Sequence, residues 1–588
     1  MTHLRTCGAA AVLLLLAAGN LIAAEIAVGP GKPFPRTEDA LARAQSGDTI
    51  LVYPQAGGAA YTKPAVYVTK SRITFKAAAP GVALSGKGYN YSGSGSVPRA
   101  IFQFNPGADG CVLDGFDLSG AHNDSHNGAG VRINQANDVT VRNCTIHDND
   151  MGIMSSGDGT PRTAAGQLIE SCLIHSNGNL ADPGYNHNLY LGGTSVTLIG
   201  CEVRSSLTGH NVKSRAHLTV VAACYIHDSS NREFDLVDAK GDTTARESNA
   251  FLAGNVIVKA PRCEGNRGVI HFGQDGGSEH DGTLTLLQNT IVTPYVSPVV
   301  ALDAAKARAF LQNNIIWDAG SGQRGQVLVD FGKAGKDAVK GTSNWAAAGF
   351  AADVARLDLA RVYVAKSGQA PPFVNAAKGD YCLARADPTI IDVGEALDAA
   401  MLAPLAAMSG KLSRDGAQDA SAGHGIGGPA AAGATSGPAG PILYQYKPPL
   451  AREDRPARGK PDLGAYEFAG DGPLEILVSV VKTTPADLAS SEILITLRNR
   501  SDADLNLDRR LLRSIMLVEV TDKDGNVVTC RRFLRLFGAG PSNALRSHGF
   551  RVGRLRRRAA PPVATPRGPV GAEECGQVTS GTRRTEQA

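Results

Sequence analysis

The chain has 588 residues, of which 59 are Lys or Arg and 55 are Asp or Glu, so its formal net charge is only +4. This near balance excludes a strongly basic protein that would attract nucleic acid through its overall charge, and we expect no nucleic-acid partner. The length leaves room for more than one domain.

Residues 1–24 have the pattern of a secretory signal peptide. His3 and Arg5 precede an apolar run from Ala9 to Ala18, and small residues end the segment. The run is too short to span a bilayer, and no second apolar stretch could do so. We therefore expect a secreted or periplasmic protein without a transmembrane segment.

The first structured element is predicted to be a short helix near residues 37–46. Thr37 is suited to the N-cap, acidic residues occupy the first turn, and Gly47 stands at the expected stop. A stack of strands exposes unpaired edges at its open end, so we expect this helix to cover that end. Strands resume at Thr49.

A repeated unit follows. The segments that begin at His187 and His210 both start with His-Asn and reach a cysteine, Cys201 or Cys224, after the same interval. Equivalent apolar–polar–apolar triplets begin at residues 116, 144, 172, 201, 224, 255, 289 and 314. Period-2 alternation bounded by turn residues indicates strands, and recurrence at this spacing indicates a repeat architecture.

The repeat predicts an all-β fold, the right-handed parallel β-helix, a solenoid of short strands. The units are too short for a crossover helix and shorter than a four-stranded propeller blade. Rungs should stack at about 4.8 Å. Nine of the ten cysteines follow the signal peptide. Four of them, Cys144, Cys172, Cys201 and Cys224, occupy equivalent inward positions, which favours a column of stacked thiols over a disulfide framework.

The domain organisation follows from changes in pattern along the chain. The β-helix domain should span residues 25–470, with the coil itself over 49–468. Three strand patterns and a hairpin turn at Asp524-Gly525 indicate a small β-sandwich-like module over 471–538. Residues 539–588 are rich in Arg and Pro and are expected to form a basic disordered tail.

In a solenoid, the same position on successive rungs forms a column on the outer surface. Alternation places Val212 and Ser214 inside the coil and turns Asn211, Lys213 and Arg215 outward. Aligning the rungs predicts an outer column of Arg132, Met154, Tyr190, Lys213, Asp235 and His271. The same alignment sets Asn188, Asn211 and Glu233 in a neighbouring row.

Side chains that handle protons on consecutive rungs suit β-elimination of a uronate-containing polysaccharide. A base removes the proton at C5, a cation neutralises the sugar carboxylate, and an acid reaches the leaving oxygen. The catalytic candidates are Tyr190, Lys213, Arg215 and His271, and the candidates for substrate binding are Arg132, Asn188, His210 and Asn211. Glu233 and Asp235 are candidate ligands for a Ca²⁺ ion.

The role of Lys213 stays open at the level of sequence. A lysine base must lose its proton, which Arg215 encourages and Asp235 opposes. The conflict disappears if Ca²⁺ occupies Glu233 and Asp235. It also disappears if Lys213 binds the substrate carboxylate while Tyr190 or His271 moves the proton.

The segment Gly209–Arg215, followed one rung later by Glu233–Leu236, resembles exported bacterial right-handed β-helix proteins. More loosely it is similar to the alginate lyase and chondroitinase B family, in which a Lys-Ser pair supplies the lysine base, as Lys213-Ser214 would here. That family carries Arg-His on the following rung, where this chain has Val237-Asp238. The resemblance covers residues 25–468 as a fold and implies a polysaccharide lyase.

Two other functions are compatible with the same fold. A glycoside hydrolase of the polygalacturonase type needs converging carboxylates, which Glu233, Asp235 and Asp238 could supply. A non-catalytic carbohydrate-binding or surface protein is the alternative of a different class, because a shared fold does not settle function. In each case we expect a monomer whose partner is an acidic polysaccharide.

Overall fold

The computed structural model forms two compact units, residues 1–468 and 469–588. It describes residues 23–468, apart from 93–97, 239–247, 262, 264–267, 276–279, 295–297, 321–325, 399, 405–406, 408–443, 449 and 457–458, and the backbone of short strands beyond 468. The predicted signal peptide lies almost wholly outside the described residues. Among the described residues, no helix combines the length and apolar character needed to cross a membrane.

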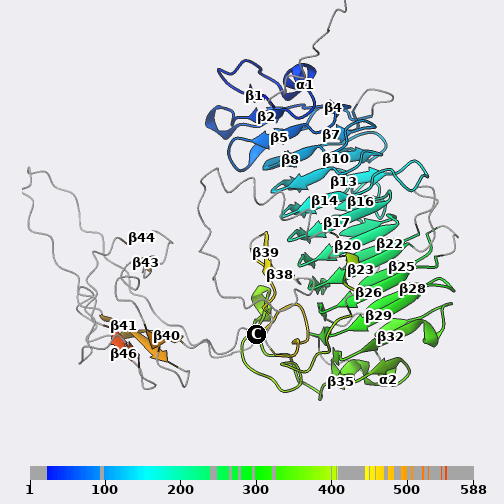
Figure 1. Cartoon of the computed structure of the whole chain (residues 1–588), viewed down its shortest axis with the longest axis vertical. Coiled ribbons are helices and arrows are strands. Elements are labelled where there is room, and N and C mark those ends of the chain that lie inside the picture. Colours follow the sequence, from blue (N-terminus) through cyan, green and yellow to red (C-terminus); the bar gives the residue numbers. More distant parts are fainter. Residues whose placement is uncertain are drawn as a thin grey trace, which may run out of the picture. The chain divides into compact units, whose positions relative to one another are not determined.

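Three parallel sheets run the length of the first unit, and each full rung contributes one strand to each sheet (Figure 1). The thirteen-stranded sheet contains β1 (Glu25–Val28), β2 (Thr49–Val52), β5 (Thr74–Ala77), β8 (Val112–Asp114), β11 (Thr140–Arg142), β14 (Gln167–Glu170), β17 (Ser195–Ile199), β20 (Leu218–Ala222), β23 (Asn249–Ala253), β26 (Thr283–Leu287), β29 (Arg308–Gln312), β32 (Val339–Thr342) and β34 (Asp358–Ala360).

The twelve-stranded sheet contains β3 (Tyr61–Thr62), β6 (Val82–Ser85), β9 (Phe116–Ser119), β12 (Thr145–His147), β15 (Leu173–His175), β18 (Glu202–Arg204), β21 (Tyr225–His227), β24 (Val256–Val258), β27 (Thr290–Thr293), β30 (Ile315–Asp318), β33 (Trp345–Ala346) and β35 (Tyr363–Val364). The eight triplets found in the sequence all fall on this sheet, at β9, β12, β15, β18, β21, β24, β27 and β30.

The ten-stranded sheet contains β4 (Val66–Val68), β7 (Ala100–Phe104), β10 (Ala129–Asn134), β13 (Met151–Ser156), β16 (Leu189–Leu191), β19 (Val212–Ser214), β22 (Phe234–Val237), β25 (Ile270–Gly273), β28 (Val300–Asp303) and β31 (Val329–Asp330). Every pairing between successive rungs is parallel. The predicted right-handed parallel β-helix is confirmed.

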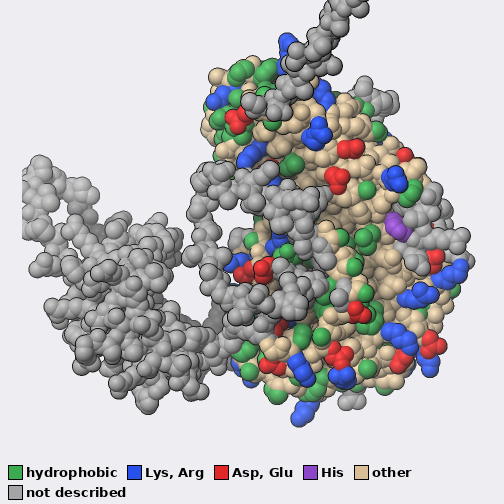
Figure 2. Space-filling model, in the orientation of Figure 1, with side chains coloured by type: hydrophobic (Ala, Val, Ile, Leu, Met, Phe, Trp, Pro, Cys, Tyr) green, Lys and Arg blue, Asp and Glu red, His purple; other side chains and the backbone are tan. Residues whose placement is uncertain are grey.

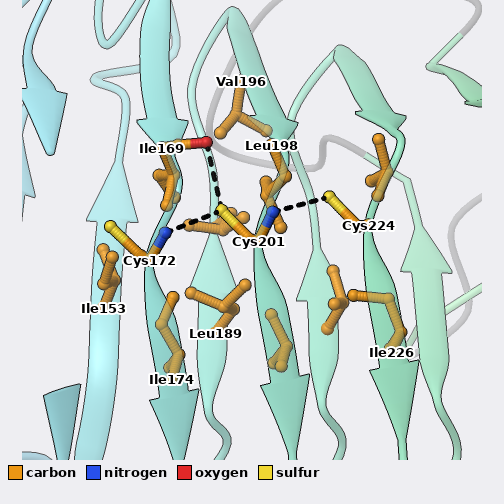
Figure 3. Packing of buried hydrophobic residues seen from close by; sticks show 14 of the residues in the cluster. Ile153, Ile169, Cys172, Ile174, Leu189, Val196, Leu198, Cys201, Cys224 and Ile226 are labelled. Carbon is orange, nitrogen blue, oxygen red and sulfur yellow. Dashed lines mark hydrogen bonds between the residues drawn. The ribbon is translucent and has the colours of Figure 1, made fainter. Parts of the chain in front are cut away.

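The interior of the coil is filled by one continuous apolar core with a sulfur column at one corner. Cys172, Cys201 and Cys224 are buried free thiols stacked on neighbouring rungs (Figure 3). The backbone N–H of Cys172 donates to Cys201 Sγ at 3.5 Å, and that of Cys201 donates to Cys224 Sγ at 3.4 Å. From Asn255 onward asparagine takes over the same corner, where side-chain amides link consecutive rungs. Cys144 is likewise a buried free thiol, on the rung before Cys172, so the predicted column of four thiols is confirmed.

Helix α1 (Thr37–Arg43) covers the N-terminal end of the coil, as predicted, and contacts β1, β2 and β4. Its boundaries differ from the expectation. Thr37 is the first helical residue and is buried, while Arg36 is the N-cap and forms no side-chain capping bond. At the other end, Lys70 Nζ donates to the carbonyl oxygens of Leu41 and Ala44 at 2.8 Å each, so a lysine from the coil satisfies the helix C-terminus.

Replacing residues 30–47, which contain α1, by a short Gly-Ser linker should expose the apolar end of the coil and the strand edges beneath it, and the protein should aggregate. Size-exclusion chromatography and light scattering measure this outcome. A soluble, monomeric and fully folded truncation would show that the coil does not need the helical cover.

The coil begins and ends earlier than expected. Glu25–Val28 already pairs with Thr49–Val52, and the last coil strand is β35, which ends at Val364. The remaining elements of the first unit are antiparallel hairpins, short helices and irregular chain. They are β36 (Phe373–Asn375), β37 (Asp380–Leu383), β38 (Tyr444–Lys447), β39 (Ala451–Asp454), α2 (Ala351–Val354), and the 3₁₀ turns η1 (Ala56–Gly58), η2 (Lys336–Ala338), η3 (Ala348–Phe350) and η4 (Ala376–Lys378).

Residues 444–468, which we call the return segment, run back along the outside of the coil, with β38 and β39 beside it in Figure 1. Arg452 forms an ion pair with Glu170 at 2.5 Å, and the backbone N–H of Ala465 donates to Thr290 Oγ1 at 3.0 Å. The return segment is fixed internally by a buried ion pair between Arg455 and Glu467 at 2.9 Å. The last residues of the return segment therefore pack against the side of the coil and do not form a further rung.

The second unit is described only by its strands, which are β40 (Leu474–Val481), β41 (Glu492–Asn499), β42 (Leu505–Asn506), β43 (Val520–Thr521), β44 (Val527–Val528), β45 (Ala544–Leu545) and β46 (Phe550–Val552). Their pairings are antiparallel. Strands β45 and β46 lie beyond residue 538, where no strand was predicted. The prediction missed them because an alternation as short as Phe550-Arg551-Val552 is not recognisable in sequence.

Candidate functional site on the ten-stranded sheet

The outer face of the ten-stranded sheet carries the predicted column in full. Residue pairing between neighbouring strands runs through Arg132, Met154, Tyr190, Lys213, Asp235 and His271 without a shift. Val212 and Ser214 are buried on either side of Lys213, as the alternation requires. These side chains are therefore neighbours on one surface.

Asp235 lies at the centre of the charged part of this column. Its carboxylate accepts hydrogen bonds from Lys213 Nζ at 2.7 Å, from Arg232 at 2.8 Å and from His271 Nδ1 at 2.8 Å. His210 Nε2 lies 3.5 Å from the same group. Burial would by itself raise the pKa of Asp235, but these donors together hold it well below its usual range. Asp235 is therefore ionised and fully occupied by donors.

A second carboxylate, Asp275, follows β25 and meets the same cluster. It pairs with Lys213 Nζ at 3.0 Å and also with Arg215. Arg215 Nε in turn donates to Tyr190 Oη at 3.2 Å, and Lys213 Nζ lies 5.9 Å from the centre of the Tyr190 ring. Lys213 and Arg215 thus form a two-cation site that holds one carboxylate, with a phenol at its edge.

The protonation of Lys213 follows from this geometry. Burial alone would lower its pKa, but Asp235 and Asp275 outweigh burial and raise it above the usual value. The two cations likewise lower the pKa of Asp275, against the effect of its partial burial. In this arrangement Lys213 is an ammonium ion, so it is suited to binding an anion and not to accepting a proton.

Two stacked histidines support the site from one side. The ring centres of His187 and His210 are 5.0 Å apart. His187 Nδ1 accepts the backbone N–H of His210 at 3.0 Å, and His210 Nδ1 accepts the backbone N–H of Arg232 at 3.2 Å. Because Nδ1 is an acceptor, both rings are neutral and carry their proton on Nε2. Burial lowers the pKa of His187 well below its usual value and that of His210 to about 4.

Asn188 and Asn211 do not face outward, which corrects their prediction as substrate-binding residues. Both are fully buried, and Asn188 Nδ2 donates to Asn211 Oδ1 at 2.8 Å. Each residue immediately precedes its strand and lies at a corner of the coil, so the in-and-out alternation of the strand does not extend to it. The asparagines form an internal ladder that joins successive corners.

Glu233 continues this internal ladder, which argues against the predicted Ca²⁺ site. Its carboxylate accepts from Asn211 Nδ2 at 2.6 Å and from the backbone N–H of Ser229 at 3.0 Å, and Lys259 Nζ lies 3.7 Å away. Glu233 points into the coil and Asp235 points out, so the two carboxylates do not converge on one cation. Within the described ranges, no group of three or more His, Cys, Asp or Glu is placed to hold a metal ion.

The buried Glu233 predicts a specific pH dependence. Burial, only partly offset by Lys259, raises its pKa from 4.5 to about 7. Because the folded state binds this proton more tightly, the contribution to stability is complete below pH 4.5 and is lost as the pH rises through 7. Between pH 4.5 and pH 8, the stability of Glu233→Gln relative to wild type should therefore increase by on the order of 3 kcal/mol. Urea unfolding of both proteins at pH 4.5 and pH 8 measures this difference. The same difference in free energy of unfolding between the two proteins at both pH values would contradict the prediction.

The column is too long for all its members to act at one bond. His271 lies three rungs from Tyr190, and Arg132 lies three rungs from Lys213 on the other side, each a separation of roughly 14 Å. Arg132 instead donates to Asn134 Oδ1 at 3.0 Å, and burial lowers its pKa to about 10. The compact centre consists of Tyr190, Lys213 and Arg215 around the Asp275 carboxylate.

Three residues of the cluster were not predicted from the sequence to belong to the site. His187 and Arg232 stand three positions before Tyr190 and Asp235, the same offset as His210 before Lys213, so rung alignment could have found them. Asp275 lies in a turn after its strand, where loop lengths differ between rungs. Its place beside the column therefore cannot be inferred by aligning the rungs.

No protein-family profile matches the chain, and no curated protein matches it in sequence. Among solved structures, the crystal structure of pectate lyase Pel9A is similar at 14% identity, covering 76% of this chain and 96% of that chain, with a TM-score of 0.41. A likeness this distant carries no information about the site residues.

Proposed function

We propose that this protein is an exported lyase that cleaves a uronate-containing polysaccharide by β-elimination, with Tyr190 as the proton-transfer residue. Lys213 and Arg215 bind the carboxylate of the sugar unit that loses its C5 proton. Asp235 fixes Lys213 in place. His271 and Arg232 act as positioning residues, because they reach the substrate site only through Asp235.

The observation that carries this proposal is the carboxylate of Asp275 between Lys213 and Arg215. An anion already occupies a site made by two cations, and a uronate carboxylate has the same charge and shape. Arg-containing sites favour carboxylates because the guanidinium offers paired donors. Tyr190 Oη borders this site through its hydrogen bond with Arg215, and its hydroxyl group can carry a proton.

In the proposed elimination, one side chain both removes the proton and returns it to the leaving group. Tyr190, as phenolate, takes the C5 proton, and Arg215 can balance the negative charge on its oxygen before the transfer. The C5 electron pair forms the double bond to C4, and the bond from C4 to the glycosidic oxygen breaks. Tyr190 then returns the proton to that leaving oxygen, while Lys213 and Arg215 stabilise the charge that develops on the sugar carboxylate.

The pKa values and positions of the acidic side chains argue against a glycoside hydrolase. A glycosidase needs one carboxyl group that is protonated at working pH and a second, ionised one. Asp235 and Asp275 both have lowered pKa values because of their cationic partners, and Glu233 lies inside the coil. Asp238 Oδ1 accepts the backbone N–H of Asp275 at 3.3 Å. Asp235, Asp275 and Glu233 are therefore not suited to act as a general acid.

The test is incubation of the purified protein with alginate, pectate and glycosaminoglycans while ultraviolet absorbance is followed. Of the reactions considered, only elimination creates an unsaturated sugar, and this product absorbs ultraviolet light. Reducing ends that appear without absorbance would indicate a hydrolase. Binding without cleavage of any polymer would indicate a non-catalytic carbohydrate-binding protein. Either of these results would overturn the proposal.

The internal carboxylate also leads to a prediction about substrate affinity. Asp275 competes with the substrate for Lys213 and Arg215, so Asp275→Asn should lower KM for the polymer several-fold. Asp330→Asn is a matched control, because Asp330 is an exposed acid in the same sheet, two rungs beyond His271. A raised KM in Asp275→Asn would show that Asp275 helps to bind the substrate.

A further inference from the structure

A second pair of cations lies on the ten-stranded sheet, on rungs that precede Tyr190 in the chain. Arg132 belongs to the column described above, and Arg99 stands immediately before β7, on the rung before that of Arg132. Burial first, and then the like charge of Arg99, lower the pKa of Arg132 to about 10, which shows that the two guanidinium groups are near each other. Both side chains are only partly buried, so a ligand can reach them.

Among the described residues, no acidic side chain pairs with either guanidinium. Arg132 Nε donates to Asn134 Oδ1 at 3.0 Å, and its Nη1 donates to the thioether of Met154 at 3.3 Å. Arg99 Nη2 donates to Asn127 Oδ1 at 2.7 Å. Amides carry no charge and a thioether is a weak acceptor. The positive charge of this pair is therefore not compensated, in contrast to that of the site occupied by the Asp275 carboxylate.

Neutral side chains hold the two arginines in place. The backbone N–H of Arg99 donates to Gln103 Oε1 at 2.8 Å, and Gln103 lies in register with Arg132. Gln103 Nε2 and Asn134 Nδ2 both donate to Asn105 Oδ1, at 2.9 Å and 3.2 Å. This network joins the two rungs without supplying a negative charge. It leaves a preformed position for an anion from outside the protein.

The distance between the two cationic sites suits a polymer with a carboxylate on every unit. Arg132 lies three rungs from Lys213, or roughly 14 Å. A pyranose unit is about as long as one rung is high, so a uronate held at Lys213 has a counterpart at Arg132 three units along. Met154 and Tyr190 lie on the rungs between and offer apolar surface to the intervening rings. Where uronate alternates with a neutral sugar, the third unit carries no carboxylate.

We propose that Arg132 and Arg99 form a second carboxylate subsite, which binds the uronate three units from the one held by Lys213 and Arg215. The inference rests on the proposed function, because that function places the reacting unit at Lys213 and Arg215. The substrate then lies along the column over at least four consecutive uronates. A continuous polyuronate satisfies both sites, whereas a glycosaminoglycan that alternates uronate with an amino sugar satisfies only one.

Calorimetric titration of the full-length Tyr190→Phe protein tests the subsite, because this variant keeps both pairs of cations and should not consume the ligand. The probes are the dimers and hexamers of galacturonate and of mannuronate, and a hyaluronan hexasaccharide as the alternating polymer. A dimer reaches one site and a hexamer reaches both. At least one uronate hexamer should bind at least about 10-fold more tightly than its dimer and than the hyaluronan hexasaccharide.

Substitutions in the same background establish where the hexamer binds. Arg132→Gln should weaken the hexamer at least about 10-fold and leave the dimer unchanged. Arg99→Gln should act in the same direction, and it tests the subsite if Arg132→Gln does not fold. Arg308→Gln is the matched control, because Arg308 is an exposed arginine on the thirteen-stranded sheet and its loss removes the same charge from another face.

Three results would overturn the subsite. They are a hexamer that binds no better than its dimer, an equal loss of hexamer affinity in Arg308→Gln, and a hyaluronan hexasaccharide that binds as tightly as the uronates. Cleavage by wild type is measured separately, through the absorbance of the unsaturated product. Elimination by wild type with no effect of Arg132→Gln on hexamer binding would refute the subsite alone. Hexamer binding that depends on Arg132, without elimination by wild type, would support the subsite and refute the proposed function.

Discussion

Tyr190→Phe should reduce kcat for elimination by at least about 100-fold, the usual contribution of a positioned acid–base group, while KM changes little. The variant keeps the ring that packs beside Met154 and His187 and loses only the hydroxyl. The two-cation site formed by Lys213 and Arg215 remains, so substrate binding should persist. Initial rates over a range of polymer concentrations separate the two parameters.

Tyr67→Phe provides a matched control for this experiment. Tyr67 belongs to the same column, since it pairs with Gln103, which pairs with Arg132. It lies four rungs from Tyr190, or roughly 19 Å, which is too far to reach the same bond. Full activity in Tyr190→Phe would remove Tyr190 from the proposed proton transfer, and an equal loss in Tyr67→Phe would show that the loss is not specific to Tyr190.

Lys259→Met should destabilise the protein by about 3–5 kcal/mol at pH 8, the cost of removing one partner of a buried ion pair. Lys259 and Glu233 both have fully buried side chains. Lys259 also donates to the backbone carbonyls of Ser229, at 3.4 Å, and Asn231, which precede Arg232 at the site. Its loss leaves these acceptors and the Glu233 carboxylate without their cation.

The loss should be smaller at pH 5, because Glu233 can then take up a proton and become neutral. The double variant Glu233→Gln/Lys259→Met removes both charges and should recover part of the stability at pH 8. Urea unfolding of wild type and the three variants gives the coupling energy. Equal losses at the two pH values would show that the carboxylate charge does not govern the effect.

The sequence was sufficient to predict the column because strand alternation and rung alignment are local rules. Lys213, Asp235 and His271 lie in register because each sits at the same place in a short strand. The rules fail at the corners, where Asn211 and Glu233 turn inward.

Other features depend on contacts between distant segments, which local rules do not reach. Asp275 joins the site from a turn. The fold of the return segment depends on contacts such as that between Arg452 and Glu170, which are 282 positions apart. Neither the loop geometry nor such a distant contact leaves a periodic trace in the chain.

The return segment has a consequence for how the coil unfolds. A solenoid whose rungs contact only their neighbours can fray from one end, with a free energy that is nearly a sum of separate rungs. Here Arg452 contacts the rung of Glu170, Tyr446 Oη donates to Glu202 at 3.4 Å, and the backbone N–H of Gly464 donates to the carbonyl of Asn313. These contacts connect rungs from β14 to β29, so the central coil should melt in one cooperative transition, while the rungs before it retain the independence of a simple repeat array.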